Sequence, residues 1–328
     1  MTAMMIEAEG LRKRFGTTQA LDGLSLAVPA GTVLGVLGPN GAGKTTAVRI
    51  LTTLAHPDAG SARVAGLDVV TQATEVKRNI GVTAQSATVD EVLTGRQNLV
   101  MIGRLSGLRR RDARARAVEL LDRFGLADAA DRPARTYSGG MRRRLDLAAG
   151  LVMRPAVLFL DEPTTGLDPT SRVNMWNVIR GLVADGATLL LTTQYLDEAD
   201  ELADRIIVID HGQAIAEGTA AELKRETGGA RMEVLLTSAH EGARDALAPL
   251  VDGEITFGQH GRHLQAPVRA AAGLTTRIVR ALDDAGIEVD DVEIRQPSLD
   301  DVFFSLTGHP TEEASEPTPD PELEVTLA

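Results

Sequence analysis

One glycine-rich segment constrains the fold of this chain more than any other, the run Gly38-Pro39-Asn40-Gly41-Ala42-Gly43-Lys44-Thr45-Thr46. It fits the phosphate-loop pattern G-x-x-x-x-G-K-[ST]. The apolar run 32–37 before it predicts a buried strand, and residues 44–54 after it predict a helix. In such a loop, backbone N–H groups and the helix N-terminus close on phosphate oxygens. We therefore predict a nucleotide-binding loop in which Lys44 reaches the β- and γ-phosphates and the Thr45 hydroxyl ligates Mg²⁺.

A pair of acids, Asp161-Glu162, follows the continuous apolar run 156–160. Continuous apolar strands are typical of a parallel sheet that is covered on both faces. Ligands bind at the carboxyl ends of the strands in open α/β sheets. We therefore predict that Asp161 holds Mg²⁺ through water and that Glu162 polarises an attacking water. The alternative, two acids on an ordinary surface, is disfavoured because a buried strand precedes them.

Composition excludes several classes of function. The 328 residues include no cysteine, so the chain has no disulfide, thiol catalyst or zinc–thiolate site. No apolar run approaches the roughly eighteen residues of a membrane helix, and residues 1–10 lack the features of a signal peptide. The net charge of −12 disfavours a general affinity for nucleic acid. We therefore expect a cytoplasmic chain that meets a membrane only through a partner.

The sequence pattern changes along the chain and predicts its domains. Residues 90–135 are rich in Leu, Ala, Arg and Glu at helical spacing, which predicts a helical insertion in an α/β domain. After residue 229 the predicted order is β-α-β-β-α-β, the ferredoxin-like arrangement, with a closing helix over 299–306. The predicted units are an α/β domain over 1–228, a helical subdomain within it at about 86–140, a small α+β domain over 229–308 and an acidic tail over 309–328.

Three segments leave two interpretations open. The tail holds six acidic residues, four prolines and no Lys or Arg, which favours disorder over a docking peptide. Five arginines between residues 109 and 116 favour a solvated helix face over binding of nucleic-acid or lipid phosphates, because the chain as a whole is acidic.

Phe303 and Phe304 point to different sides of one helix. Either one packs inward while the other meets a second surface, or both lie in one interdomain core.

The order of the motifs resembles that of ATP-binding subunits of ABC transporters, over about residues 5–228. The phosphate loop is similar to the Walker A loop, and the acid pair is similar to Walker B with its catalytic glutamate. Between and after them lie segments that resemble the Q-loop, the signature motif and the D-loop, namely Gln85, Tyr137-Ser138-Gly139-Gly140-Met141 and Gly166-Leu167-Asp168. The resemblance implies a P-loop NTPase fold whose helical subdomain faces the membrane part of a transporter.

The resemblance also implies a set of site residues. Phe15 resembles the aromatic residue that stacks on adenine, although the residues alone favour a core phenylalanine there. The implied ATP-binding residues are Phe15, Gly38, Pro39, Asn40, Gly41, Ala42, Gly43, Lys44, Thr45, Thr46, Gln85, Ser138, Gly139 and Gly140. The implied Mg²⁺ ligands are Thr45, Gln85 and Asp161, and the implied catalytic residues are Lys44, Glu162 and Gln194.

Two departures from the family pattern affect these expectations. The signature usually begins with Leu and ends with Gln, whereas this chain has Tyr137 and Met141. The atoms that contact phosphate, the Ser138 hydroxyl and the glycine amides, remain. The switch position, which is usually His, is Gln194. An amide donates a hydrogen bond to a phosphate oxygen but cannot carry a proton as imidazole does, so we expect slow turnover.

Two short segments, 194–200 and 297–303, resemble the daunorubicin-resistance type of drug-exporter ATPase. This implies a homodimeric subunit with ATP at its interface, peripheral on the inner face of the cell membrane and without a nucleic-acid partner. ATP hydrolysis would drive efflux of a drug or other hydrophobic compound through a separate integral membrane permease. One alternative is a soluble ABC ATPase of translation or DNA repair, which usually has two cassettes or a coiled-coil insertion. A second is a non-catalytic regulator, which Gln194 supports.

Overall fold

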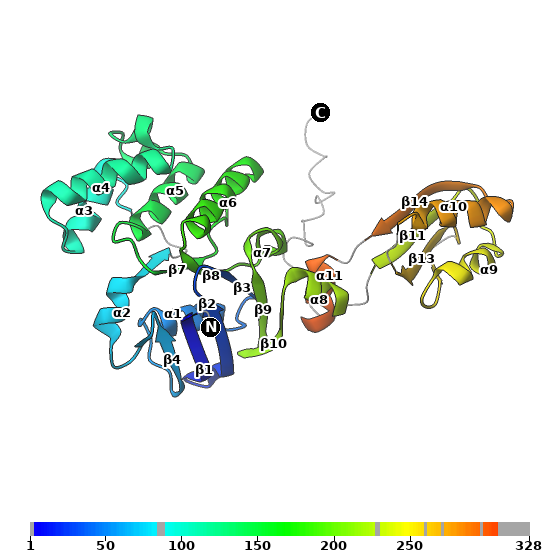
Figure 1. Cartoon of the computed structure of the whole chain (residues 1–328), viewed down its shortest axis with the longest axis horizontal. Helices are drawn as coiled ribbons and strands as arrows, with labels where there is room; N and C mark the ends of the chain where they lie inside the picture. The colour runs from blue at the N-terminus through cyan, green and yellow to red at the C-terminus, as the bar shows by residue number, and fades with distance from the viewer. Residues whose placement is uncertain are drawn as a thin grey trace, which may run out of the picture. The chain divides into compact units, whose positions relative to one another are not determined.

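The computed structural model describes residues 3–83, 89–226, 230–258, 261–269, 272–295 and 298–307 (Figure 1). Two compact units are present, divided between Ala220 and Ala221. Two sequence predictions, those for Gln85 and for the tail over 309–328, lie outside the described residues.

A six-stranded sheet forms the centre of the first unit, in the order β10-β9-β3-β8-β7-β6. All neighbours from β9 to β6 are parallel, and β10 pairs with β9 antiparallel. The strands are β3 (Val33–Leu37), β6 (Ile80–Thr83), β7 (Val157–Asp161), β8 (Thr188–Thr192), β9 (Arg205–Asp210) and β10 (Gln213–Gly218). Every residue of β3, β7 and β8 is buried, because layers cover both faces of these strands. The prediction of a parallel, doubly covered sheet is confirmed.

A second, antiparallel sheet in the order β2-β1-β4-β5 covers one side of this unit. Its strands are β1 (Met4–Phe15), β2 (Thr18–Pro29), β4 (Ala59–Val64) and β5 (Leu67–Asp68). Two ion pairs involve residues of the β1–β2 hairpin. Arg12 pairs with Asp22 at 2.9 Å and Lys13 with Asp58 at 2.7 Å. The apolar side chains of this hairpin, of α1 (Lys44–Leu51) and of the central sheet form one core cluster.

One apolar cluster joins the other face of the central sheet to helices that include the predicted helical insertion (Figure 1). The helices of the unit are α2 (Ala73–Asn79), α3 (Gly95–Leu105), α4 (Arg110–Arg123), α5 (Gly139–Gly150), α6 (Pro169–Ala184) and α7 (Leu196–Leu202), with 3-10 turns at Ala127–Ala129 and Ala134–Thr136. Four of the five clustered arginines are exposed, as predicted for a solvated helix face. The fifth, Arg116, is half-buried and pairs with Glu119.

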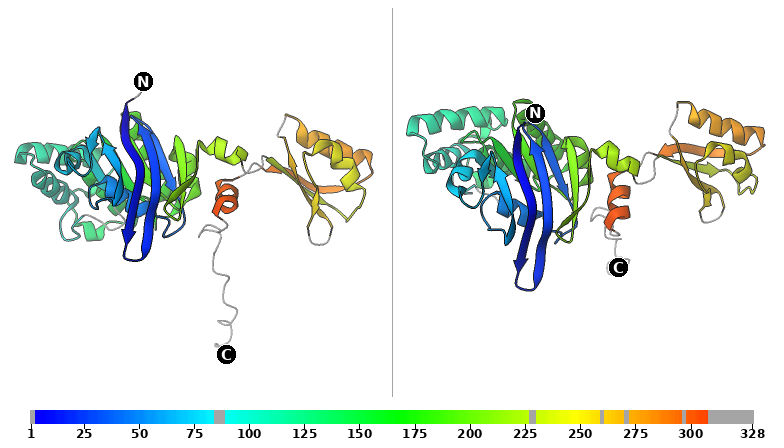
Figure 2. Two further views of the ribbon diagram at one scale, coloured as in Figure 1. Left: turned by 90° about the horizontal axis from the view of Figure 1, so that it is seen from below. Right: turned by 60° about the horizontal axis from the view of Figure 1, so that its bottom comes forward.

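A four-stranded antiparallel sheet in the order β12-β13-β11-β14 forms the second unit. Its elements are β11 (Ala230–Leu236), α9 (Ala243–Leu247) with a 3-10 turn at Ala248–Leu250, β12 (Thr256–Phe257), β13 (His263–Val268), α10 (Leu274–Asp284) and β14 (Val289–Arg295). Helices α9 and α10 cover one face of the sheet (Figure 2), and β11 accordingly alternates buried and exposed residues. The predicted β-α-β-β-α-β order is therefore observed.

Helices α8 (Ala220–Glu226) and α11 (Leu299–Thr307) lie side by side in Figures 1 and 2. In α11, Phe303 is 6% exposed and Phe304 is 57% exposed. The interpretation that both rings lie in one core is therefore wrong, because a helix directs adjacent side chains about 100° apart. Among the described helices, we find none that is long and apolar enough to cross a membrane.

Candidate nucleotide site

The phosphate loop connects β3 to α1, and its backbone requires glycine at Gly43. This residue precedes α1 with a φ of 110°, in the left-handed region. A Cβ atom there would lie 2.5 Å from the carbonyl oxygen of Ala20 on β2. Any larger residue would therefore push the loop away from the β1–β2 hairpin. The hairpin and the loop together fix where the amide groups at the start of α1 point.

Lys44 lies folded into this loop. Its side chain is 5% exposed, and its Nζ donates hydrogen bonds to the carbonyl oxygens of Gly38 at 2.6 Å and Pro39 at 3.1 Å. Thr45 is exposed and Thr46 is half-buried. The loop thus gathers a cation, a helix N-terminus and hydroxyl groups in one place, which is the donor set that binds nucleotide phosphates.

The loop borders a cavity of about 360 Å³ to which Glu162 of the acid pair also contributes. Glu162, at the end of β7, lines it although it is far from the loop in sequence. The parallel sheet explains this juxtaposition, because β8 lies between β3 and β7 and all three strands end at the same edge. The cavity is lined by Thr18, Ala20, Pro39, Asn40, Gly41, Ala42, Gly43, Lys44, Thr45, Thr46 and Glu162.

The two acids are held by contacts with neighbouring segments. Asp161 is buried, and its Oδ1 accepts a hydrogen bond from the hydroxyl of Thr192 on β8. Glu162 accepts a 3.2 Å hydrogen bond at Oε2 from the Thr165 hydroxyl, and its N–H donates to the Thr192 carbonyl oxygen at 2.9 Å. Glu162 has a φ of 47°, in the left-handed region that glycine favours. A strained backbone thus directs its carboxylate toward the phosphate loop.

An arginine that the sequence analysis did not single out binds the backbone of this segment. Arg143, on α5, donates from Nη2 to the carbonyl oxygens of Asp161 at 3.0 Å and Glu162 at 2.8 Å. Its Nε donates to the carbonyl oxygen of Pro163 at 2.8 Å. Burial lowers the pKa of the Arg143 guanidinium, and the nearby carboxylate of Asp146 opposes that shift most.

The signature segment caps α5 and packs against α6. The Oγ of Ser138 accepts a hydrogen bond from the Met141 N–H at 3.2 Å, as an N-cap does. A Cβ atom at Gly140 would lie 2.7 Å from the Oγ of Ser171, so only glycine allows α5 and α6 to approach this closely. Ser138 and Gly139 are exposed. Among the described residues that line the phosphate-loop cavity, none comes from the signature segment.

Both departures from the family signature are explained by packing. Tyr137 is 3% exposed, and its hydroxyl donates to the carbonyl oxygen of Ala129 at 2.7 Å. Burial raises the pKa of this phenol. Met141 packs against the same apolar cluster of α3 to α6. Tyr137 and Met141 therefore contribute to the core, while Ser138 and Gly139 keep their exposed surface.

Two further predicted residues, Gln194 and Phe15, are also among the described residues. Gln194 is half-buried, two residues after Thr192, which pairs with Asp161 between β8 and β7. Phe15 ends β1 with 50% of its surface exposed, and the Nζ of Lys13 lies 5.5 Å from its ring centroid. The interpretation of Phe15 as a core residue is therefore wrong. Its exposed ring is available for stacking.

Asp168 and Glu198 are two further acidic residues whose contacts shift their pKa values. Asp168, the N-cap of α6, accepts hydrogen bonds from the hydroxyl of Ser171 at 2.6 Å and from its N–H at 2.9 Å, which lower the pKa of Asp168. Glu198, on α7, is fully buried and accepts from Trp176 Nε1 at 3.3 Å. Burial raises the pKa of Glu198. In sequence, Glu198 looks no different from its exposed neighbour Asp197.

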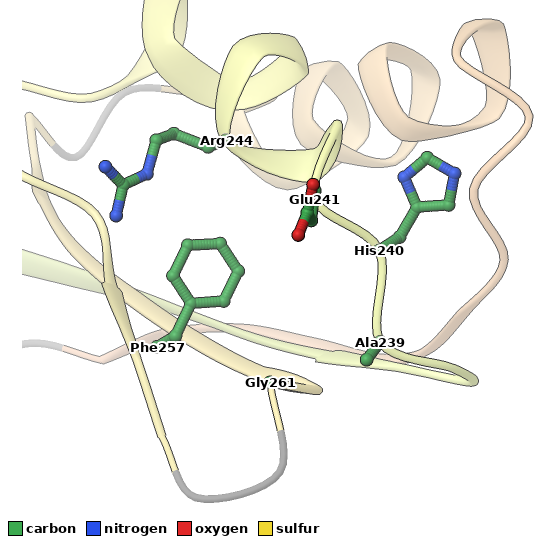
Figure 3. Close-up of a pocket in the computed structure, with 6 residues that line it drawn as sticks. All are labelled: Ala239, His240, Glu241, Arg244, Phe257 and Gly261. Carbon is green, nitrogen blue, oxygen red and sulfur yellow. The ribbon is translucent and has the colours of Figure 1, made fainter.

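A larger cavity of about 540 Å³ lies in the second unit (Figure 3). The guanidinium of Arg244 lies 5.4 Å from the ring centroid of Phe257 and donates to the carbonyl oxygen of Ile255 at 3.3 Å. Figure 3 shows the His240 ring turned away from that pair. Glu241, Arg244 and His240 are all exposed to solvent. Because the nucleotide motifs lie in the first unit, we assign the nucleotide site to the phosphate loop.

Comparisons with known proteins agree with this assignment. The family model described as ABC transporter matches residues 21–165. The chain is 56% identical to the daunorubicin resistance ATP-binding protein DrrA2 of Streptomyces coeruleorubidus, over 95% of this chain and 98% of that protein. It is 38% identical to the Nod factor export ATP-binding protein I of Ralstonia nicotianae, over 93% and 94% respectively. The solved ADP conformation of MJ1267, an ATP-binding cassette of an ABC transporter, matches with a TM-score of 0.62 and 28% identity, over 67% of this chain and 93% of that one.

Proposed function

This chain belongs to the ABC transporter family as an ATP-binding subunit that hydrolyses ATP, and we propose that it drives drug efflux through a separate integral membrane permease. The substrate class is supported by relatives named for daunorubicin and doxorubicin resistance, including DrrA of Streptomyces peucetius, which is 53% identical to this chain. The transported compound is then a drug or another hydrophobic compound. The family relationship also supports a position on the inner face of the cell membrane.

The observation that carries the proposed mechanism is the shared cavity of the phosphate loop and Glu162. Lys44 neutralises charge on the β- and γ-phosphates, and Glu162 orients a water for in-line attack on the γ-phosphate. Gln194 donates a hydrogen bond to a γ-phosphate oxygen. Because an amide cannot take up a proton, the Gln194 side chain positions the phosphate without acting as a base.

The residues at the site fit Mg²⁺. The Thr45 hydroxyl and the Asp161 carboxylate are hard oxygen donors of the kind that Mg²⁺ prefers. The hydrogen bond from Thr192 fixes the orientation of the Asp161 carboxylate. We assign the metal contacts to Thr45, to Asp161 through water and, on the family resemblance, to Gln85. When bound, Mg²⁺ supplies charge neutralisation on the phosphate oxygens.

The proposed active form is a homodimer with two ATP molecules at its interface. Ser138 and Gly139 are exposed and lie outside the phosphate-loop cavity of their own chain. In a head-to-tail dimer, Ser138, Gly139 and Gly140 of one protomer face the phosphate loop of its partner. The exposed Phe15 ring stacks on adenine. One ATP therefore contacts both copies, and its hydrolysis lets the copies separate.

A surface cavity of about 430 Å³ supports a binding site for the membrane permease on this chain. Its lining comes from α2, β6, α3 and α5, which are parts of the cassette core and of the helical subdomain. Apolar side chains such as Ile80, Val82 and Met153 line it together with the cations Lys77 and Arg78. We propose that a segment of the permease binds there. β6, which contributes to this lining, ends at Thr83, two residues before Gln85 in the sequence.

The proposed domains are the cassette over residues 1–228, with its helical subdomain at about 86–140, the accessory domain over 229–308 and the tail over 309–328. The accessory domain has its own apolar core, formed by residues such as Met232, Leu264 and Ile278. All the nucleotide motifs precede it in the chain. We therefore assign this domain to assembly rather than to chemistry.

The function is tested by co-expressing this chain with the membrane permease of its own operon in a daunorubicin-sensitive host. Cells with the parent protein are expected to accumulate less daunorubicin than cells with Glu162→Gln, which binds ATP but does not complete turnover. A non-catalytic regulator predicts equal accumulation for both proteins. That result, with both proteins present at the membrane, would overturn efflux of daunorubicin driven by this chain.

A further inference from the structure

We propose that Arg143 is a positioning residue that holds the backbone of Glu162 in its left-handed conformation for ATP hydrolysis. The guanidinium of Arg143 contacts three consecutive carbonyl oxygens, those of Asp161, Glu162 and Pro163, at 2.8–3.0 Å. These carbonyls flank the backbone torsions of Glu162. This inference rests on the proposed role of Glu162 as the residue that orients the attacking water.

The backbone of Glu162 needs such support because its φ of 47° is unfavourable for a residue with a side chain. Left-handed conformations of non-glycine residues cost of the order of 1–3 kcal/mol and persist only where the surrounding structure fixes them. The Thr192 carbonyl oxygen holds the N–H of Glu162 on one side. Arg143 holds the carbonyl oxygens on the other, so the peptide groups on both sides of the residue are fixed.

The chemistry of arginine suits this task. A planar guanidinium presents several donors at fixed angles, whereas a lysine ammonium acts as a point charge on a flexible stem. The Arg143 side chain is 12% exposed, and its Nη1 lies 3.7 Å from the Oδ2 of Asp146, one helical turn along α5. The Asp146 side chain is 1% exposed. A buried carboxylate thus helps to orient the guanidinium, and hydrogen bonds from a charged donor are stronger than those between neutral groups.

The position of Arg143 also connects two parts of the proposed dimer site. It lies on α5, the helix whose N-cap is the signature residue Ser138. A movement of α5 is therefore transmitted through Arg143 to the carbonyl oxygens around Glu162. We infer that engagement of Ser138 with the ATP of the partner protomer and alignment of Glu162 are mechanically linked.

Two substitutions at Arg143 and one matched control test this role. Arg143→Gln removes both the positive charge and the planar guanidinium, while Arg143→Lys keeps the charge and loses the planar set of donors. Arg144→Gln is the control, because Arg144 lies on the same helix but donates to the carbonyl oxygens of Phe124 at 3.0 Å and Gly140 at 3.4 Å, away from Glu162. Steady-state ATPase rates give kcat and KM, ATP titration gives Kd, and thermal unfolding gives Tm.

The expected result is a loss of kcat with little change in affinity. Arg143→Gln should lower kcat by about 10-fold or more while KM and Kd stay within about twofold, since positioning affects the transition state more than the bound ground state. Arg143→Lys should restore part of that loss. Arg144→Gln should lower Tm without a comparable loss of kcat. An equal loss of kcat in the Arg143 and Arg144 variants, or a parent kcat in Arg143→Gln, would overturn the inference.

A double-mutant cycle separates this inference from the proposed role of Glu162 itself. In a Glu162→Gln background, Arg143→Lys should cause no further loss of kcat, because no carboxylate remains to be positioned. A full additional loss would overturn the inference, because Arg143 would then act independently of Glu162. If Glu162→Gln alone hydrolysed ATP at the parent rate, the role proposed for Glu162 would fail, and with it the basis of the inference.

Discussion

The hydroxyl of Thr165 donates a 3.2 Å hydrogen bond to the Oε2 of Glu162, three residues earlier in the chain. This contact fixes one oxygen of a carboxylate that lines the phosphate-loop cavity. Only 8% of Glu162 is exposed. Burial and this hydrogen bond together restrict the conformations of its side chain. The carboxylate is thus held in place before nucleotide binds, as expected for a group that orients water.

Glu162→Gln is expected to bind ATP normally and to hydrolyse it about 10²-fold more slowly or worse, the usual contribution of a positioned acid–base group. Phosphate release measures the rate, and size-exclusion chromatography with ATP should show an accumulated dimer. Asp197→Asn serves as the control, because it makes the same chemical change at an exposed acid on α7. Hydrolysis by Glu162→Gln at the rate of this control would rule out the assignment.

The switch position gives a second prediction. Gln194→Ala should lose turnover because it removes the proposed hydrogen bond to the γ-phosphate, whereas Gln194→His should retain or raise it, since imidazole both donates a hydrogen bond and carries a proton. Single-turnover hydrolysis with excess enzyme isolates this step from product release. Equal rates for the parent and both variants would show that residue 194 takes no part in the reaction.

The buried carboxyl of Glu198 predicts a pH dependence of stability. Because burial raises its folded pKa above the ordinary value of 4.5, the unfolded chain releases this proton at a lower pH than the folded chain. Its stabilising contribution is complete below 4.5, decreases above that pH and is lost once the pH exceeds the folded pKa. Glu198→Gln has no such proton, and its amide oxygen can still accept from Trp176. The Tm of this variant relative to the parent should therefore rise between pH 5 and pH 9, and a difference independent of pH would contradict the prediction.

Tyr137 offers a test of the unusual signature. Tyr137→Phe leaves the ring in the core but removes the hydrogen bond to the Ala129 carbonyl oxygen, which should cost about 1 kcal/mol. Thermal unfolding should show a Tm lower by about 2–4 °C, with KM for ATP unchanged. Tyr195→Phe is the control, since the described residues give the Tyr195 hydroxyl no hydrogen-bond partner. A large rise in KM for Tyr137→Phe would show that this residue contacts nucleotide after all.

The elements that carry chemistry were predictable because their signals are local. The strand, glycine-rich loop and helix around Lys44 are consecutive in sequence, and α1 ends at Leu51, only three residues before the predicted end. Helix α6 was missed although its start signals are present, an Asp168 N-cap and a proline at the first helical position. Its buried residues Met175, Ile179 and Leu182 also follow helical spacing.

Contacts that depend on how a helix packs against the sheet were not predictable from the sequence. Arg142, Arg143 and Arg144 are identical neighbours in sequence, yet helix geometry directs them about 100° apart. Arg142 pairs with Glu91 on the surface, Arg143 binds the backbone around Glu162, and Arg144 binds the Phe124 carbonyl oxygen. The packing of α5 against the sheet decides which of the three arginines meets the segment around Glu162. No short sequence motif indicates that packing.

The accessory domain gives the last prediction, because one of its helices has an exposed aromatic side chain. In α11, Phe303 is buried, whereas Phe304 is 57% exposed and Leu306 is 40% exposed. Large exposed apolar side chains also occur at surfaces that meet another protein. We therefore predict that α11 contributes to pairing with the permease or with the second ATPase copy.

Phe304→Ser should leave Tm and ATP binding unchanged but reduce co-purification with the permease or dimerisation with ATP, because it removes an exposed apolar contact and no core packing. Phe303→Ala, in contrast, should lower Tm by creating a cavity, at a cost of about 3–5 kcal/mol. Deleting residues 229–328 should likewise preserve ATP crosslinking to the cassette while weakening assembly. If both Phe304→Ser and the deletion co-purified with the permease, dimerised and supported drug efflux as the parent does, the accessory domain would have no role in assembly.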